Sequence, residues 1–178
     1  MSGAEPDTFE LADSASHLLH RAEQLASDRF SLLVGKDVTL RQFAVLAAIA
    51  QAPGVSQADL VRITGVDRST IAGIVVRLQK HGWVERAEDP SDKRANTVTL
   101  TKEGERVLQA AAKHAKAADA AILDALPRTK GKTLISILKK LTKHAEELAA
   151  KAEKEAKRQA KREREAAAGK NGKRRARK

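Results

Sequence analysis

The sequence predicts a mostly α-helical domain that carries a small β-hairpin. Apolar residues recur every three or four positions through most of the chain, which is the spacing of helices with one buried face. Between about residues 83 and 100 this period gives way to two short segments separated by a polar turn sequence, which is typical of a hairpin. Aromatic residues make up only 2% of the chain, so we expect the helices to pack through aliphatic side chains.

Length and composition exclude several classes of protein. The 178 residues fit one domain with extensions. The absence of Cys excludes disulfides, thiolate metal sites and Cys nucleophiles, and it fits a reducing cytosol. The segment Met1–Phe9 is polar and acidic, so no signal peptide is expected, and residues 1–8 are expected to be disordered. No stretch approaches the roughly 18 apolar residues of a membrane-spanning helix, so we expect a cytoplasmic protein with no membrane partner.

Four helices are predicted before the hairpin. The first runs from Phe9 to Leu33, and the second begins at Thr39, where Thr39 and Gln42 form a capping-box pattern. Ser56 and Asp67 are positioned to cap the next two. These run through Thr64 and to His81, Gly65 makes the turn between them, and Gly82 is placed to end the fourth. The apolar residues of the fourth helix share one side: Ile71, Ile74, Val75 and Leu78.

The rest of the chain is predicted to form the hairpin and two long helices. The strands are Trp83–Arg86 and Asn96–Leu100, and a helix then runs from Thr101 through Leu126, where Pro127 ends it. A last helix begins at about Thr129. Its aliphatic stripe stops before Ala150 and consists of Leu134, Ile137, Leu138, Leu141, Ala145 and Leu148.

The net charge of +11 is concentrated in a C-terminal tail. Residues 151–178 contain 13 Lys and Arg against 4 Glu, a net charge of +9, whereas residues 1–150 carry 21 basic against 19 acidic side chains, a net charge of +2. Good helix formers in 151–168 are expected to extend the last helix into solvent, and 169–178 are expected to be disordered. Because the charge belongs to the tail, it does not by itself show that the folded part binds nucleic acid.

The order helix, helix, glycine turn, helix and hairpin predicts a winged helix-turn-helix, in which the second helix of the motif enters the DNA major groove. The first turn of that helix would meet base edges and phosphates, and it carries Arg68, Ser69 and Thr70. Arg77, two turns further along, is predicted to reach a phosphate. An ordinary solvated helix end is the alternative for this cluster.

Two segments resemble the MarR family of transcriptional regulators. Val66–Ile71 and Leu78–Arg86 look like its recognition helix and first wing strand. Asp89–Ala95 and Val98–Gly104 are similar to the family's wing signature, Asp-Pro-x-Asp-Arg-Arg followed by Val-x-Leu-Thr-x-x-Gly. The resemblance covers about residues 11 to 148 and is specific because the two signatures occur together.

The resemblance implies that the wing tip contacts DNA. Lys93 stands where the family has its first Arg, and Lys lacks the bidentate fork of Arg. Arg94 is therefore assigned to the DNA minor groove, whose negative potential attracts Arg, and Asp92 is expected to brace it. A simple charged turn is the alternative.

The resemblance also implies a homodimer that binds a pseudo-palindromic operator on double-stranded DNA, at the nucleoid. Residues 9–35 and 102–150 would be the dimerisation helices, 36–101 the winged helix-turn-helix and 151–178 a basic tail. Many members are repressors that a small-molecule effector releases, often an aromatic acid or its thioester, bound between the dimerisation helices and the DNA-binding part. An effector pocket formed by His17, Arg21 and Arg41 is one hypothesis, although a solvated polar face is favoured for these residues.

No enzyme, cofactor or metal is predicted. The chain has no phosphate-binding Gly loop and no nucleophile-elbow pattern, and among its five His only His17 and His20 have helical ligand spacing. The alternative function is an architectural protein that coats DNA through the basic tail without sequence preference, because a tail of this charge strengthens any DNA binding. The wing signature favours the regulator.

Overall fold

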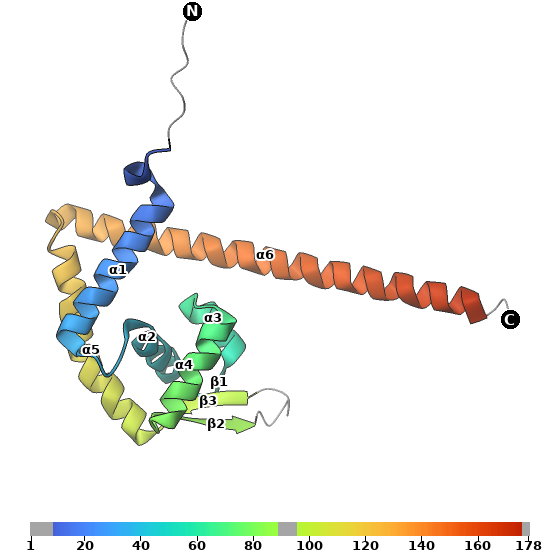
Figure 1. Ribbon diagram of the computed structural model, residues 1–178, viewed down its shortest axis with the longest axis horizontal. Coiled ribbons are helices and arrows are strands. Elements are labelled where there is room, and N and C mark those ends of the chain that lie inside the picture. The colour runs from blue at the N-terminus through green and yellow to red at the C-terminus, as the bar shows by residue number, and fades with distance from the viewer. Residues whose placement is uncertain (1–8, 89–95, 176–178) are drawn as a thin grey trace, which may run out of the picture. The chain divides into compact units, whose positions relative to one another are not determined.

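The computed structural model describes residues 9–88 and 96–175. The chain divides into two compact units, the first ending at Pro127 and the second beginning at Arg128. Figure 1 shows the elements of the first unit, in chain order: η1 (Leu11–Asp13), α1 (Ala15–Val34), α2 (Leu40–Gln51), β1 (Val55–Ser56), α3 (Gln57–Thr64), α4 (Arg68–Lys80), β2 (Val84–Glu88), β3 (Asn96–Leu100) and α5 (Lys102–Leu123). The second unit is one helix, α6 (Arg128–Arg175).

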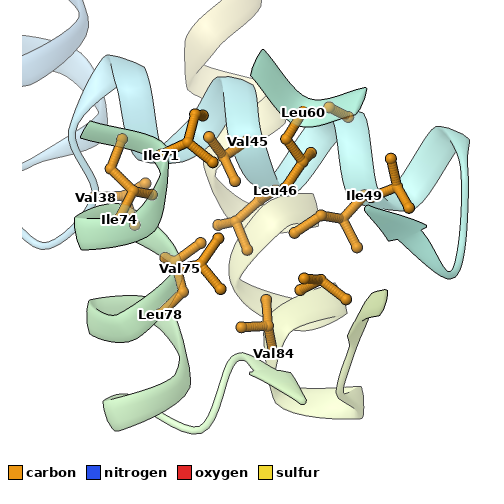
Figure 2. Close-up of a cluster of buried hydrophobic side chains, with 13 residues drawn as sticks. Val38, Val45, Leu46, Ile49, Leu60, Ile71, Ile74, Val75, Leu78 and Val84 are labelled. Atoms are coloured by element: carbon orange, nitrogen blue, oxygen red, sulfur yellow. The ribbon is translucent and has the colours of Figure 1, made fainter. Parts of the chain in front are cut away.

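The core of the first unit lies where α2, α3 and α4 meet the small sheet. Figure 2 shows aliphatic side chains from these elements pointing toward one another. Val45, Leu46 and Ile49 of α2 have no exposed surface. Burying a side chain of this size contributes about 1.5–3 kcal/mol, so α2 is the central element on which the short helices and the hairpin are held. The predicted buried side of α4 is confirmed, since all four of its apolar residues are at most 2% exposed.

The sheet has three antiparallel strands in the order β1-β3-β2. The hairpin pairs Val84 with Leu100 and Glu85 with Thr99 at its root. Its first strand begins at Val84, one residue later than predicted, and runs to Glu88. The strand β1 was not predicted, because two residues are too few to show an alternating pattern. Val55 of β1 pairs with Val98 of β3, and Val98 is fully buried. This short strand therefore pairs with the edge of the central strand that the hairpin leaves open.

The helix caps predicted from the sequence are confirmed at several helix ends. The Thr39 hydroxyl accepts the backbone N–H of Gln42, and the Gln42 side chain accepts the backbone N–H of Thr39. The side chains of Ser56 and Asp67 cap α3 and α4, each by accepting the backbone N–H of the residue three positions later. Gly82 has a φ of 72° and follows the C-cap of α4, as expected.

Besides that of the first hairpin strand, three predicted boundaries are wrong. The first helix begins at Ala15 instead of Phe9, because the Ser14 hydroxyl caps it by accepting the backbone N–H of His17. The helix α5 ends at Leu123, one turn before the predicted Leu126. A proline disfavours helical geometry at the residue that precedes it, and Pro127 follows Leu126 directly.

The third correction concerns the C-terminus. Disorder was expected from residue 169, whereas α6 continues to Arg175. The Ala-, Lys- and Arg-rich composition favours helix, and each isolated Gly costs only about 1 kcal/mol. The expected disorder of residues 1–8 lies outside the described residues. Across the described ranges, no helix is both long and apolar enough to cross a membrane.

Candidate nucleic-acid interface

The turn between α3 and α4 presents α4 to solvent. Gly65 ends α3 in the left-handed conformation, with a φ of 68°, which favours glycine because it has no Cβ. Its N–H donates to the Val61 carbonyl, N···O 2.9 Å. Only Val66 and Asp67 separate this glycine from the first residue of α4. The two helices therefore form a compact helix-turn-helix unit.

The predicted DNA contacts of α4 lie outside its fully buried face. Arg68, Ser69 and Arg77 are exposed, and Thr70 is half-buried. The structure thus places all four on the second helix of the motif, with both guanidinium groups accessible. Because the apolar side is held by the core, α4 cannot turn its cations inward without exposing four aliphatic side chains.

The N-cap of α4 organises its first turn. The Asp67 carboxylate accepts the backbone N–H of Thr70, N···O 2.9 Å, and the Ser69 hydroxyl, O···O 2.6 Å. These hydrogen bonds hold the pKa of Asp67 well below its usual range, the Ser69 hydroxyl being the largest cause and Thr70 the next. Since the Ser69 proton is donated to Asp67, the lone pairs of that hydroxyl remain available to accept a hydrogen bond.

The root of the wing is attached to both neighbouring helices. The Thr101 backbone N–H donates to the Trp83 carbonyl, N···O 3.0 Å, and its hydroxyl donates to the Gly82 carbonyl, O···O 2.6 Å. The same hydroxyl accepts the N–H of Gly104 and so caps α5. A Cβ added at Gly104 would lie 1.9 Å from the Trp83 carbonyl oxygen, so only glycine permits this approach. The predicted tip residues Asp92, Lys93 and Arg94 lie outside the described residues.

A cavity of about 480 Å³ opens beside the first half of α4. We call it the α1–α4 cavity; its lining includes Arg41 of α2 and both Thr70 and Arg77 of α4. The Arg41 guanidinium is paired with the Glu23 carboxylate of α1, N···O 3.2 Å. One predicted effector residue and two predicted DNA-contact residues therefore face the same space.

The other two predicted effector residues lie elsewhere on α1. His17 is half-buried and Arg21 is exposed, and neither lines the α1–α4 cavity. The structure of a single chain does not bring them together with Arg41. No group of three or more His, Asp or Glu side chains suited to a metal ion occurs within the part of the chain that the structure describes.

A second cavity, of about 680 Å³, lies between the C-terminal end of α4 and the helix α5 and was not predicted from the sequence. His81 and Trp83 stack there with their ring centroids 4.6 Å apart, and Lys36 and His114 also line the space. The isolated Trp in a chain so poor in aromatic residues was the available signal. The meeting of these residues, which are far apart in sequence, could not be read from spacing.

A helix that buries one side and exposes cations on the other, held beside a β-hairpin, is the arrangement of winged helix-turn-helix proteins, which bind DNA through that helix. Comparison with known proteins narrows this class. A family model described as "MarR family" matches residues 36–95. The transcriptional regulator HosA of Escherichia coli O111:H- is 32% identical over 131 residues, which cover 74% of this chain and 96% of HosA. The chain belongs to the MarR family and is a DNA-binding transcriptional regulator.

Solved structures agree with this assignment. The PcaV transcriptional regulator of Streptomyces coelicolor, solved in complex with its natural ligand, is similar with a TM-score of 0.71 and 29% identity over 78% of this chain and 98% of PcaV. BpsR of Bordetella bronchiseptica, whose DNA binding is regulated by 6-hydroxynicotinic acid, has a TM-score of 0.71 and 26% identity over 76% of this chain and 97% of BpsR. The predicted family and fold class are confirmed, and the regulator is favoured over the architectural protein.

Proposed function

We propose that this protein is a homodimeric repressor, that it binds a pseudo-palindromic operator through α4 and the wing, and that a small aromatic acid releases it. The observation that carries the proposal is the second helix of the motif, α4, which buries one face and leaves Arg68, Ser69 and Arg77 exposed. Its action on DNA at the nucleoid needs no chemical step, so we propose no catalytic activity.

Base reading is assigned to the first turn of α4. Ser69 donates its proton to Asp67, so toward DNA it acts as an acceptor, and an amino group of adenine or cytosine is the partner that fits in the major groove. Arg68 and Arg77 would hold phosphates and set the register of the helix. At the wing tip Arg94 would enter the minor groove, with Lys93 as a second cation and Asp92 bracing the turn.

Dimerisation is assigned to 9–35 and 102–150, with 36–101 as the DNA-binding region between them. The helix α1 leaves Leu18, Leu25 and Leu32 substantially exposed in a single chain, and α6 leaves Ile137, Leu141 and Leu148 exposed. Large aliphatic side chains in rows of this kind favour burial against another chain. A dimer places two copies of α4 for half-sites about one helical turn of DNA apart.

The DNA assignment is tested with an operator selected from random DNA fragments by the purified protein. Arg77→Ala and Arg94→Ala should each weaken operator binding at least tenfold at physiological salt, because each removes a contact to the DNA backbone or minor groove. Thr70→Ala and Ser69→Ala should reduce discrimination between operator variants by about 1–3 kcal/mol. Arg106→Ala is the matched control, since Arg106 is an exposed cation of α5 paired with Glu103. Equal losses in Arg77→Ala and Arg106→Ala would refute the assignment to α4.

The effector is assigned to the α1–α4 cavity, because Arg41 and two residues of α4 line it. A ligand carboxylate would compete with Glu23 for Arg41, and the ring would lie against α4 and change its presentation to DNA. The test titrates operator complexes with small aromatic acids, beginning with 6-hydroxynicotinic acid. An acid that releases the wild type should require at least tenfold more for Arg41→Ala, and Arg41→Lys should be intermediate. Equal sensitivity of all three proteins would place the site elsewhere, with His17 and Arg21 as the next residues to test.

A further inference from the structure

The relatives cover only part of this chain, and α6 is the longest helix that the structure describes. HosA and PcaV are covered over 96% and 98% of their own lengths, but they cover only 74% and 78% of this chain. About a quarter of the chain therefore has no counterpart in them, and α6 alone is 48 residues long. A helix of this length and charge needs its own explanation.

The cations of α6 form a row along one side of the helix. At 100° per residue, all ten basic positions from Lys132 to Arg162 fall within an arc of about 140°, and the structure describes the side chains of nine of them. We call this set the basic row; its members are Lys132, Lys139, Lys140, Lys143, Lys151, Lys154, Lys157, Arg158 and Arg162. All nine side chains are exposed. The cations of residues 151–162 thus continue a one-sided feature that begins at Lys132.

The apolar stripe of α6 lies on the other side of the same helix. Leu134, Leu138, Leu141, Ala145 and Leu148 are spaced by alternating steps of four and three residues, and they fall within about 80° of arc. The centre of this arc is about 150° from the centre of the basic row. A dimer contact through the apolar stripe would therefore leave the basic row free, so both surfaces can act at once.

The dimensions and chemistry of the basic row fit duplex DNA. Thirty residues of helix separate its ends, or about 45 Å at 1.5 Å per residue, and duplex DNA carries one negative charge per 1.7 Å along its axis. Seven of the nine cations are Lys, which binds phosphate as a point charge and reads no sequence. An anionic membrane fits less well, because the side opposite the basic row beyond residue 150 offers Ala152, Ala156 and Gln159, with no large apolar side chain to insert.

We propose that the basic row of α6 is a second DNA-binding surface, which holds the phosphates of duplex DNA. It adds affinity without sequence preference. Two of its members form pairs along the helix, Lys157 with Glu153 and Lys143 with Glu147, N···O 2.6 and 4.0 Å, and exposed pairs of this kind are easily exchanged for phosphate. The proposal does not depend on the contacts assigned to α4.

The test neutralises the C-terminal part of the basic row in the full-length protein. The variant carries Gln in place of Lys151, Lys154, Lys157, Arg158 and Arg162, and Gln preserves helix propensity. Fluorescence anisotropy measures its affinity for a mixed-sequence duplex of about 40 base pairs across a series of salt concentrations. We expect at least tenfold weaker binding at physiological salt. The slope of log K against log salt should become shallower by about 0.9 for each lost phosphate contact, up to about 4.5 per chain.

Two controls separate charge from structure. One variant places Gln at Ala152, Ala156 and Ala160, off the basic row; it should bind like the wild type. Another changes Lys151, Lys154 and Lys157 to Arg; it should keep the salt slope. Circular dichroism should show equal helicity in all proteins. An unchanged slope in the neutralised variant would overturn the proposal, and so would an equal loss in the Ala-to-Gln variant. Loss of binding to vesicles with about 30% anionic lipid, with DNA binding intact, would assign the row to membranes and overturn it as well.

The experiment distinguishes this surface from the one assigned to α4. Neutralising the basic row should weaken operator and mixed-sequence DNA by the same factor, so the ratio of the two affinities should not change. Arg77→Ala should instead lower operator affinity in a protein whose α6 is intact. A neutralised variant that loses operator preference would place sequence recognition in α6 and contradict the proposal.

Discussion

The helices α4 and α6 both expose cations, but their orientation has different physical origins. The helix α4 has 13 residues, and four of its side chains are at most 2% exposed. These four side chains hold one face of α4 against the core. In α6, the segment beyond residue 150 has Ala as its most apolar residue, and its helical form rests on propensity and on pairs along the helix. Packing specifies one surface, and composition specifies the other.

This difference teaches which kind of recognition each helix supports. Reading a base edge requires a side chain held to a fraction of an ångström, which a packed helix with a capped first turn provides. Attraction of phosphates requires only charge at the right spacing, which an exposed helix provides. The division of labour proposed for the two helices follows from their packing.

The largest expected effect tests whether the apolar stripe of α6 packs against a second copy of the chain. Leu138→Glu combined with Leu141→Glu should abolish the dimer, because an unpaired carboxylate in an apolar contact costs several kcal/mol. Sedimentation at micromolar concentration measures the change. The matched control is Thr133→Glu with Ser136→Glu, which adds the same charge at exposed positions off the apolar stripe. A dimer in both double variants would show that α6 contributes no packed face.

A smaller effect tests the packing of α4 at adjacent positions. Val75→Ala should lower the free energy of unfolding by about 2 kcal/mol, because it removes two buried methyl groups from a fully enclosed site. Val76→Ala, at a position that is 54% exposed, should leave stability unchanged or raise it slightly, since Ala is the better helix former. Urea unfolding compares the two. Similar losses at both positions would contradict the packed orientation of α4.

The smallest effect concerns the cap of α4 and its dependence on pH. The pKa of Asp67 is lowered in the folded protein by its hydrogen bonds from Ser69 and Thr70, so the carboxylate stabilises the fold above its ordinary pKa of 3.8. That contribution is lost as the pH falls from about 4 toward the lower folded-state pKa. Asp67→Asn keeps a capping oxygen but does not titrate. The difference in Tm between wild type and Asp67→Asn should therefore change between pH 5 and pH 2.5, and a constant difference would contradict this account.

Much of the winged module could be predicted because its signals are local. A capping residue such as Thr39 or Asp67 acts on a backbone N–H only two or three residues away, so its position in the sequence is sufficient. The buried side of α4 was predicted for the same reason, since the helical period places residues of one face three and four apart. Where two local signals compete, the predicted boundary differs from the observed one. The cap at Ser14 makes α1 begin later than predicted, and Pro127 makes α5 end earlier than predicted.

The sequence by itself indicated the family through the resemblance of its motifs. It also determined the order of helices and hairpin, the capped first turn of α4 and the one-sided rows of α6, because each of these depends on spacing along the chain. The tertiary structure alone decided that β1 covers Val98, that Gly104 lies against the Trp83 carbonyl, and that Arg41 faces the same cavity as Thr70 and Arg77. These are contacts between residues far apart in sequence. Their geometry follows from how whole elements pack around the core, and no local pattern encodes it.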